Sequence, residues 1–322
     1  MLITTKKKGE EEMERSEESI DQILAKLEKV KDPVRDNYYY YCYQGFWIQE
    51  VILKRILSFP IDQFVAQDDD ILLTSCPKSG TTWLQSLVFS IVKRNSNSNS
   101  NNPLISSNPH DLIHPLELSL NDESKQRIMF THFPYSALPP SIKHSKCKII
   151  YICRNPLDLF ISHWHFVHQI LGDVIEPNHL EECFDMFCKG IHAFGPFWEH
   201  ILGFWKVSLE MPERILFLKY EELKKDNVFF IKKIADFLGF PFSTEEENRG
   251  VPKEIEKMCS FENMKNVDVN KTSKHSLGMS NSSFFRKGEI GDWVNYLTPE
   301  MAEIGKKLIE EKFGESGLMF DF

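Results

Sequence analysis

From Asp70 onward, short runs rich in β-branched residues alternate along the chain with amphipathic stretches. The apolar run ILLTS precedes TTWLQSLVFSIVKR, the run KIIYIC precedes PLDLFISHWHFVHQI, and RILFLKY precedes VFFIKKIADFLGF. A strand followed by a helix, repeated along a chain, is typical of a parallel sheet covered on both faces. The pattern therefore predicts an α/β fold with a central, mainly parallel sheet flanked by helices.

The polar segments predict where this pattern is interrupted. We expect residues 1–20 to form a charged, flexible tail, followed by a short helical stretch through Ile20, Leu24 and Leu27. The low-complexity segment 95–102 predicts an exposed loop. The polar segment 268–283 predicts a mobile loop or lid before a last helix over 298–312.

Charge and composition exclude several classes of protein. The 322 residues contain 38 Lys and Arg against 47 Asp and Glu, a net charge of −9, which argues against a generally basic nucleic-acid surface. An anionic ligand would need a local basic site. No apolar run reaches the length of a membrane span, and the N-terminus lacks the apolar region of a secretory signal. The seven scattered cysteines contain no C-x-x-C motif, so we expect a cytoplasmic protein without a zinc finger.

The segment CPKSGTTW lies between the first predicted strand and helix. A loop at this place directs backbone N–H groups and the positive end of the helix dipole at one point. Lys78 adds a charge, Gly80 allows close backbone approach, and the hydroxyls of Ser79, Thr81 and Thr82 can donate further bonds. The order of glycine and lysine does not match a Walker A motif. The same residues also fit a simple connection in which threonine caps the helix.

A second strand end carries Arg154, followed by Pro156 and Asp158 at the start of a helix. The arginine fork suits a phosphate, and Ser162 could add a hydroxyl. A phosphoryl-transfer enzyme would be expected to place an acidic metal ligand here. The alternative is that Arg154 merely pairs with Asp158 and that Ser162 lies on a helix surface.

Two further segments carry candidate chemistry. Arg286 and Lys287 precede Gly288 in FFRKGEIGDW and could surround a phosphate, although solvated surface charge is the alternative. His132 lies in FTHFPYSALPP at a predicted strand end, where a histidine can act as a general base. His163, His165 and His168 leave only an i, i+3 pair on one helix side, so we expect helix surface and pocket wall rather than a metal site.

Taken in order, the motifs CPKSGTTW, TH-x-P, RNP-x-D-x-x-x-S and RKG-x-x-GDW resemble those of the cytosolic PAPS-dependent sulfotransferases, where PAPS is 3′-phosphoadenosine 5′-phosphosulfate. The segments YQGFW and LKYEEL are similar to those of the plant branch, the flavonol and brassinosteroid type. The resemblance covers roughly residues 40–322. It implies one P-loop-like α/β catalytic domain over 21–322 and PAPS as the sulfuryl donor, with no metal.

The resemblance also implies a role for each matching residue. Those expected around the 5′-phosphosulfate are Lys78, Ser79, Gly80, Thr81 and Thr82. Those expected around the 3′-phosphate are Arg154, Ser162, Arg286, Lys287 and Gly288. Those expected around the adenine are Trp83, Phe261 with its neighbour Ser260, and Tyr220. His132 is similar to the family's base, which removes the acceptor proton during in-line attack, while Lys78 neutralises charge on the leaving nucleotide.

The acceptor is less defined by the sequence. Aromatic residues flank the motifs and predict an apolar pocket for a hydroxylated aromatic or steroid-like metabolite, namely Phe46, Trp47, Phe133, Tyr135 and Trp164. Phe130 and His163 depart from residues common in the family, which makes the acceptor side more apolar and alters its wall. Plant relatives sulfate flavonols, brassinosteroids, hydroxyjasmonate and desulfoglucosinolates, and the sequence does not choose among these acceptors.

Other departures bear on partners and on rival functions. Val294 and Pro299 stand at the lysine and valine positions of the animal dimerisation pattern, although Thr298 and Glu303 match it, so we expect a monomer. We expect a small hydroxylated acceptor and neither nucleic acid nor membrane as partners. Two alternatives remain: an inactive member of the same fold that binds small molecules, and a nucleotide-dependent kinase.

Overall fold

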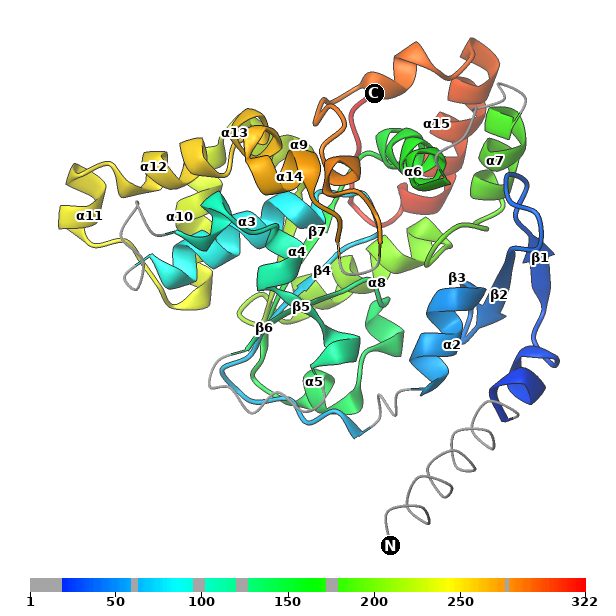
Figure 1. The fold of residues 1–322 in the computed structure, drawn as a ribbon, viewed down its shortest axis with the longest axis horizontal. Helices are drawn as coiled ribbons and strands as arrows, with labels where there is room; N and C mark the ends of the chain where they lie inside the picture. Colours follow the sequence, from blue (N-terminus) through cyan, green and yellow to red (C-terminus); the bar gives the residue numbers. More distant parts are fainter. Residues whose placement is uncertain (1–18, 59–62, 95–101, 120–126, 172–178, 276–277) are drawn as a thin grey trace, which may run out of the picture.

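The computed structural model describes residues 19–58, 63–94, 102–119, 127–171, 179–275 and 278–322. A five-stranded parallel sheet forms its centre, in the order β5-β6-β4-β7-β8 (Figure 1). The strands are β4 (Ile71–Thr74), β5 (His114–Pro115), β6 (Ile128–Thr131), β7 (Lys148–Cys153) and β8 (Ile215–Lys219). The α/β fold with a central, mainly parallel sheet is therefore confirmed, and each strand of the alternating pattern forms where predicted.

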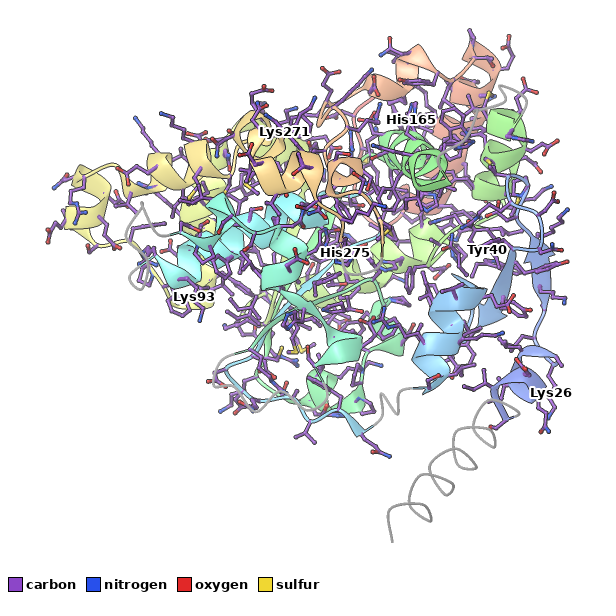
Figure 2. All side chains as sticks on the ribbon, in the orientation of Figure 1. Lys26, Tyr40, Lys93, His165, Lys271 and His275 are labelled. Carbon is purple, nitrogen blue, oxygen red and sulfur yellow. The ribbon has the colours of Figure 1, made fainter. Side chains whose placement is uncertain are left out.

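Strand residues alternate between two core clusters. Leu72, Ile149 and Tyr151 face one cluster, whereas Leu73, Ile150 and Ile152 face the other. This alternation follows from the two-residue period of a strand, so a sheet that is apolar throughout needs helices on both faces. The side chains of both clusters fill the space between the sheet and its helices (Figure 2).

The helices cover the two faces. One cluster includes residues of α3 (Thr81–Lys93), α10 (Asn227–Leu238) and α12 (Val251–Met258). The other includes residues of α6 (Pro156–Leu171), α7 (His179–Cys188), α8 (Phe197–Glu210) and α15 (Pro299–Phe313). The remaining helices are α2 (Glu50–Ser58), α4 (Pro109–Leu112), α5 (Pro140–His144), α9 (Tyr220–Lys225), α11 (Thr244–Asn248), α13 (Phe261–Asn266) and α14 (Asp268–Thr272). The predicted last helix is α15, which Thr298 caps by accepting the N–H of Met301.

A second, antiparallel sheet was not predicted. It consists of β1 (Lys29–Lys31), β2 (Tyr39–Tyr43) and β3 (Phe46–Gln49). Figure 1 shows it beside the central sheet. The helical residues 19–24 precede it, and their Ile20 and Leu24 are buried in the core. Most of the predicted charged tail, residues 1–18, lies outside the described residues, as does nearly all of the predicted loop 95–102.

The prediction of a loop over 268–283 was wrong for the described residues. That segment contains α14, a β-bridge between Lys274 and Ser280, and the 3₁₀ turn η6 (Asn281–Phe284). The amide of Asn270 donates to the carbonyl of Met264, and the amide of Asn281 donates to the carbonyl of Val269. The asparagines are therefore polar partners inside the fold, although their polarity was interpreted as solvent exposure. Within the part of the chain that is described, no helix is long and apolar enough to span a membrane.

Candidate active site

The carboxyl ends of β4, β6, β7 and β8 surround one cavity of about 350 Å³. Parallel strands bring their carboxyl ends to the same edge of a sheet, which is where open α/β folds bind ligands. Every residue predicted to bind the donor or to act as base, except Ser79, lines this cavity. These residues are Lys78, Gly80, Thr81, Thr82, Trp83, His132, Arg154, Ser162, Tyr220, Ser260, Phe261, Arg286, Lys287 and Gly288.

The loop between β4 and α3 adopts a tight conformation. Lys78 and Gly80 both have positive φ, 72° and 108°. A Cβ on Gly80 would lie 2.8 Å from the ring of Tyr220, so only glycine lets this aromatic ring approach the loop. Lys78 has no such freedom, and its strained backbone directs its side chain into the cavity.

The hydroxyl groups of this loop differ in their hydrogen-bond partners. Thr81 Oγ1 lies 2.6 Å from Ser75 Oγ, and Thr82 Oγ1 lies 2.9 Å from Nε2 of His110. The N–H of Ser79 donates to the carbonyl of Cys76, and its buried Oγ has no hydrogen-bond partner among the described residues. Ser79 therefore does not face the cavity with the rest of its motif, because its backbone closes the turn.

Lys78 is a half-buried cation that forms no ion pair with a carboxylate of the described residues. Its Nζ lies 3.8 Å from the ring centroid of Phe166. Burial lowers the pKa of Lys78 to about 7, and the positive charges of Arg154 and Arg286 contribute in the same direction. An anion in the cavity would oppose the effects of burial and of the two arginines. It would raise the pKa of Lys78, because it would stabilise the ammonium form.

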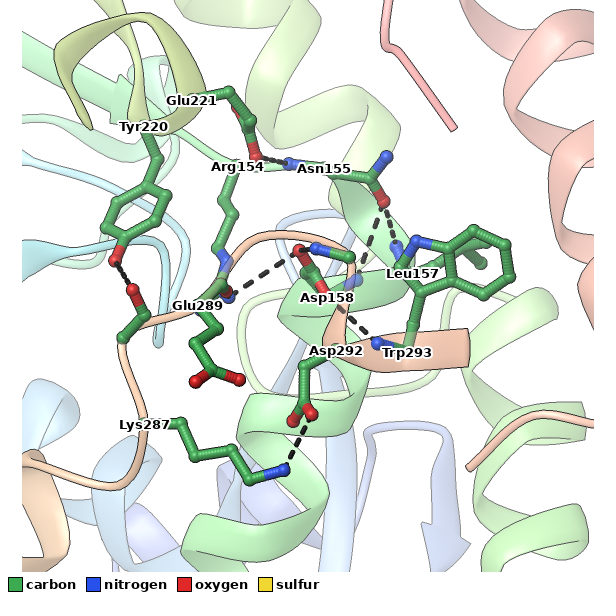
Figure 3. A network of polar contacts seen from close by, with 12 residues as sticks. Arg154, Asn155, Leu157, Asp158, Tyr220, Glu221, Lys287, Glu289, Asp292 and Trp293 are labelled. Atoms are coloured by element: carbon green, nitrogen blue, oxygen red, sulfur yellow. Dashed lines mark hydrogen bonds and ion pairs between the residues drawn. The ribbon is translucent and has the colours of Figure 1, made fainter. Parts of the chain in front are cut away.

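Arg154 lies at the end of β7 with a guanidinium only partly satisfied. Its Nη2 donates to the carbonyl of Glu289 and lies 3.6 Å from Oδ2 of Asp158, while the buried Nε has no hydrogen-bond partner among the described residues (Figure 3). Arg154 therefore does pair with Asp158, as the alternative interpretation expected. The guanidinium nevertheless keeps an N–H that bonds none of the described residues. Ser162 is 8% exposed and lines the cavity, so it does not lie on a helix surface.

Asp158 ties a distant segment to α6. Its carboxylate accepts the N–H of Gly291 at 2.7 Å and the N–H of Trp293 at 3.1 Å (Figure 3). It therefore positions the segment that carries Arg286 and Lys287.

Arg286 and Lys287 both pair with the buried carboxylate of Asp292, at 2.6 and 2.7 Å. The Nε of Arg286 is buried and has no hydrogen-bond partner among the described residues. The carbonyl of Gly288 accepts the hydroxyl of Tyr220 and the ammonium of Lys224. These contacts tie the basic residues to the fold, so they are more than solvated surface charge.

Aromatic rings form another part of the cavity wall. The rings of Trp83 and Tyr220 meet edge to face, with centroids 5.4 Å apart. A Cβ on Gly288 would lie 2.6 Å from the ring of Phe261, so this glycine permits close contact with it. Ser260 caps the helix that begins at Phe261, because its Oγ accepts the N–H of Asn263. Such rings offer apolar faces to a flat ligand.

His132 presents one defined nitrogen for chemistry. A carbonyl oxygen only accepts hydrogen bonds, so Nδ1 of His132, 2.9 Å from the carbonyl oxygen of Ser75, carries the proton. This leaves a lone pair on Nε2. Burial lowers the pKa of His132 to about 4, partly offset by the bond to Ser75. The side chain is therefore a neutral base at physiological pH.

The aromatic residues predicted for the acceptor pocket do not line this cavity. Phe46 and Phe133 border a separate cavity of about 360 Å³, and Trp164 borders a small one of about 40 Å³. Trp47 and Tyr135 belong to the core packing. The aromatic residues that flank the motifs in the sequence thus pack in the core or border other cavities. Phe166 and Phe284 form the aromatic wall near Lys78.

The histidines of α6 also differ from the prediction. His163 borders the small cavity and not the one that His132 lines, and His168 is buried and does not lie on the helix surface. The described residues contain no group of three potential metal ligands.

The cavity residues that sequence reasoning missed include two that form hydrogen bonds within the site. His110 contacts the ring of Phe284, with centroids 4.4 Å apart, and bonds Thr82. The one sequence feature that could have indicated an ordered position for His110 is the helix-capping residue Asn108, whose side chain accepts the N–H of His110. Lys224 lies one helical turn after Tyr220 and bonds the same carbonyl, but nothing in its spacing distinguishes it from a surface lysine.

Comparisons with known proteins agree with this geometry. The family model described as "Sulfotransferase domain" matches residues 68–317. Flavonol 3-sulfotransferase of Flaveria bidentis is 47% identical over 87% of this chain and 92% of its own. Cytosolic sulfotransferase 15 of Arabidopsis thaliana is 43% identical over 88% of this chain and 82% of its own.

Solved structures show the same architecture. An Arabidopsis thaliana protein described as a "putative steroid sulphotransferase" is 37% identical and superposes with a TM-score of 0.72, covering 93% of this chain and 94% of its own. A mouse sulfotransferase solved in complex with PAP is 30% identical with a TM-score of 0.69, covering 86% of this chain and 95% of its own. Family model, relatives and fold agree, and the chain belongs to the sulfotransferase family.

Proposed function

We propose that the protein transfers the sulfuryl group of PAPS to a hydroxyl of a small, largely apolar metabolite. The observation that carries this proposal is one cavity with two kinds of chemistry. The neutral base His132 lines it together with Lys78 and with Arg154 and Arg286, whose Nε atoms bond none of the described residues. A base and an anion site in one cavity suit the transfer of an anionic group to a neutral alcohol.

The residues present fit the proposed donor. PAP, bound by the mouse relative, is the nucleotide that remains when PAPS loses its sulfuryl group. The unpartnered Nε atoms of Arg154 and Arg286 would hold the 3′-phosphate, with Ser162, Lys287 and Gly288. The adenine would lie among the rings, and Lys78 with the amides of its loop would hold the 5′-phosphosulfate. The role of Ser79 is confined to shaping that loop.

The proposed step is a single in-line displacement. Nε2 of His132 takes the proton of the acceptor hydroxyl while its oxygen forms a bond to sulfur, and the bond from sulfur to the bridging oxygen breaks. The electron pair of the breaking bond stays on the 5′-phosphate of the departing nucleotide. Lys78 and the loop amides stabilise that developing charge.

The weak basicity of His132 favours a phenolic acceptor. Burial lowers the pKa of His132, and a phenol, with a pKa of about 10, gives up its proton to a weak base more readily than an aliphatic alcohol does. The similarity to flavonol sulfotransferases points in the same direction. We therefore propose a flavonoid or a related phenol ahead of a steroid alcohol.

Rival functions are less well supported. A kinase would need free carboxylates to hold Mg²⁺, but Asp158 is occupied by backbone amides and Asp292 by Arg286 and Lys287. An inactive binding protein would not need a base with a fixed tautomer in the donor cavity. We propose a cytoplasmic location, in line with the relative named cytosolic. We also propose a monomeric state, from the departures in the dimerisation pattern.

Replacement of His132 by alanine tests the proposal. With labelled PAPS and a panel of phenols, we expect the wild type to form a sulfate ester and His132→Ala to lose about 10²–10⁴-fold in kcat. Affinity for PAP, measured by calorimetry, should change little, because the proposed step uses His132 on the acceptor hydroxyl and not on the nucleotide. Turnover near the wild-type level in a variant that binds PAP would contradict His132 as base, and no product with any hydroxylated acceptor would favour the inactive binder.

A further inference from the structure

A pair of buried side chains outside the cavity holds the backbone of His132. Nε2 of His200, on α8, lies 2.9 Å from the carbonyl oxygen of His132. The hydroxyl of Tyr151, on β7, lies 2.9 Å from Nδ1 of the same His200. Both side chains are fully buried and neither lines the cavity, so the step described above does not use them.

The protons in this network have one consistent arrangement. The His132 carbonyl only accepts, so Nε2 of His200 carries a proton and donates it. Burial lowers the pKa of His200 to about 4, which leaves Nδ1 as a lone pair for the Tyr151 hydroxyl. Burial also raises the pKa of Tyr151 well above its usual value, so this hydroxyl keeps the proton that it donates.

The network continues to the loop that carries Lys78. The ring of His132 donates to the carbonyl of Ser75, and the hydroxyl of Ser75 lies 2.6 Å from that of Thr81, the first residue of α3. His132 is thus held twice, by its backbone through His200 and by its ring through Ser75. The second contact ties it directly to the donor loop.

We propose that Tyr151 and His200 are positioning residues that hold the base His132 in register with the donor loop. This inference rests on the proposed function. Transfer in line requires the reacting atoms at about 3 Å, and a displacement of 1 Å can cost about 100-fold in rate. Neither residue touches donor or acceptor, and both act through the backbone of His132.

Two substitutions of His200 separate positioning from volume. We expect His200→Leu to lower kcat about tenfold or more, because the His132 carbonyl loses its donor and shifts. His200→Gln offers an amide N–H to the same carbonyl and should recover kcat to within about threefold of the wild type. Affinity for PAP should be unchanged in both variants.

A third substitution removes only the hydroxyl. Tyr151→Phe keeps the ring, which stacks on Phe204 and Phe217 at 4.4 and 5.2 Å between centroids. His200 then has one anchor instead of two, so we expect a loss in kcat between those of the Gln and Leu variants. This variant also keeps the test decisive if His200→Leu does not fold.

Tyr40→Phe is the matched control. Tyr40 is a buried tyrosine of β2 in the antiparallel sheet (Figure 2), its hydroxyl accepts from Gln49 at 3.3 Å, and it forms no hydrogen bond to Tyr151, His200 or His132. Both Tyr-to-Phe variants should lower the melting temperature, but only Tyr151→Phe should lower kcat. An equal effect on kcat in the two variants, or a parallel loss of PAP affinity, overturns the proposal.

A measurement without turnover separates this inference from the proposed function. NMR titration of His132, assigned with His132→Ala, should find the wild-type ring neutral at pH 5.5, as its burial beside Lys78 and His110 requires. Displacement toward water in His200→Leu, or in Tyr151→Phe if the former does not fold, should raise that pKa toward 6.5. An unchanged His132 pKa overturns the positioning role even in a protein without sulfotransferase activity.

Discussion

At the scale of single residues, burial is the main influence on the protonation of the two groups proposed to act at the reacting atoms. His132 and Lys78 line the same cavity, and burial moves both toward their neutral forms. For His132 the neutral form is the working one, because only a lone pair can accept a proton. For Lys78 the charged form is needed, so the donor must arrive while that charge is present.

This difference predicts the pH dependence of the reaction. A lysine loses its charge as pH rises through its pKa, here about 7 in the free protein, so kcat/KM for PAPS should fall above about pH 7. The alkaline fall in kcat should lie at higher pH than the fall in kcat/KM, because bound phosphosulfate raises the pKa of Lys78 and so restores its ammonium form. Rate measurements between pH 5.5 and 9.5 check this. Lys78→Arg, whose charge does not titrate in that range, should lose the alkaline limb, and persistence of the limb in that variant would contradict the assignment.

At the scale of elements, the cavity depends on how a late segment is fastened to an early helix. Asp158 in the first turn of α6 holds the backbone of Gly291 and Trp293, so residues far apart in the chain are aligned before any ligand binds. Figure 3 shows this carboxylate between the helix and the segment that carries Lys287. Anion binding therefore rests partly on a residue that is itself acidic.

Removal of this carboxylate should weaken donor binding without deleting a ligand contact. Asp158→Ala leaves two backbone N–H groups without their acceptor, each at a cost of about 1–3 kcal/mol, and frees the basic segment. We expect a lower melting temperature and a loss of about tenfold or more in PAP affinity by calorimetry. Asp158→Asn keeps one acceptor oxygen, so its melting temperature and its PAP affinity should lie between those of the wild type and Asp158→Ala. Asp185→Ala, which removes an exposed pair with Lys189, serves as control, and an equal effect there would refute this role.

The elements also explain what the sequence could and could not predict. The motifs after β4, β6 and β7 were identifiable because a parallel sheet sends strand ends to one edge, whatever the intervening loops do. The role of Asn270 could not be inferred in this way, because a buried amide and a solvated one look alike in sequence. The aromatic residues near YQGFW and His132 were assigned to a pocket but pack in the core or line other cavities. Tyr151 and His200 looked like ordinary core residues, since only coordinates reveal that they share a hydrogen bond.

At the scale of the whole molecule, an acidic protein holds a basic cavity. The net charge of −9 is spread over the surface, whereas Lys78, Arg154, Arg286 and Lys287 converge on one site. Charges separated by more than about 10 Å are largely screened at 0.1 M salt. Local charge should therefore decide donor affinity, and total charge should not.

A surface variant tests that separation. Glu181, Glu245 and Glu310 are exposed residues of α7, α11 and α15, and replacing all three by Gln changes the net charge from −9 to −6. Because these sites are screened from the cavity, PAP affinity at 0.15 M salt should stay within about twofold. Lys287→Gln alters the net charge by one unit at the cavity and should cost about tenfold. A larger effect from the triple variant than from Lys287→Gln would show that total charge governs binding.

Ser75 has a consequence for how such an enzyme can change its substrates. Its carbonyl holds the base and its hydroxyl bonds the first residue of the donor helix, so the two partners of the reaction share one attachment point at the end of β4. Any shift of that strand moves both together and preserves their alignment. Acceptor choice can then diverge through the surrounding wall without disturbing the reacting geometry, which separates the evolution of specificity from that of catalysis.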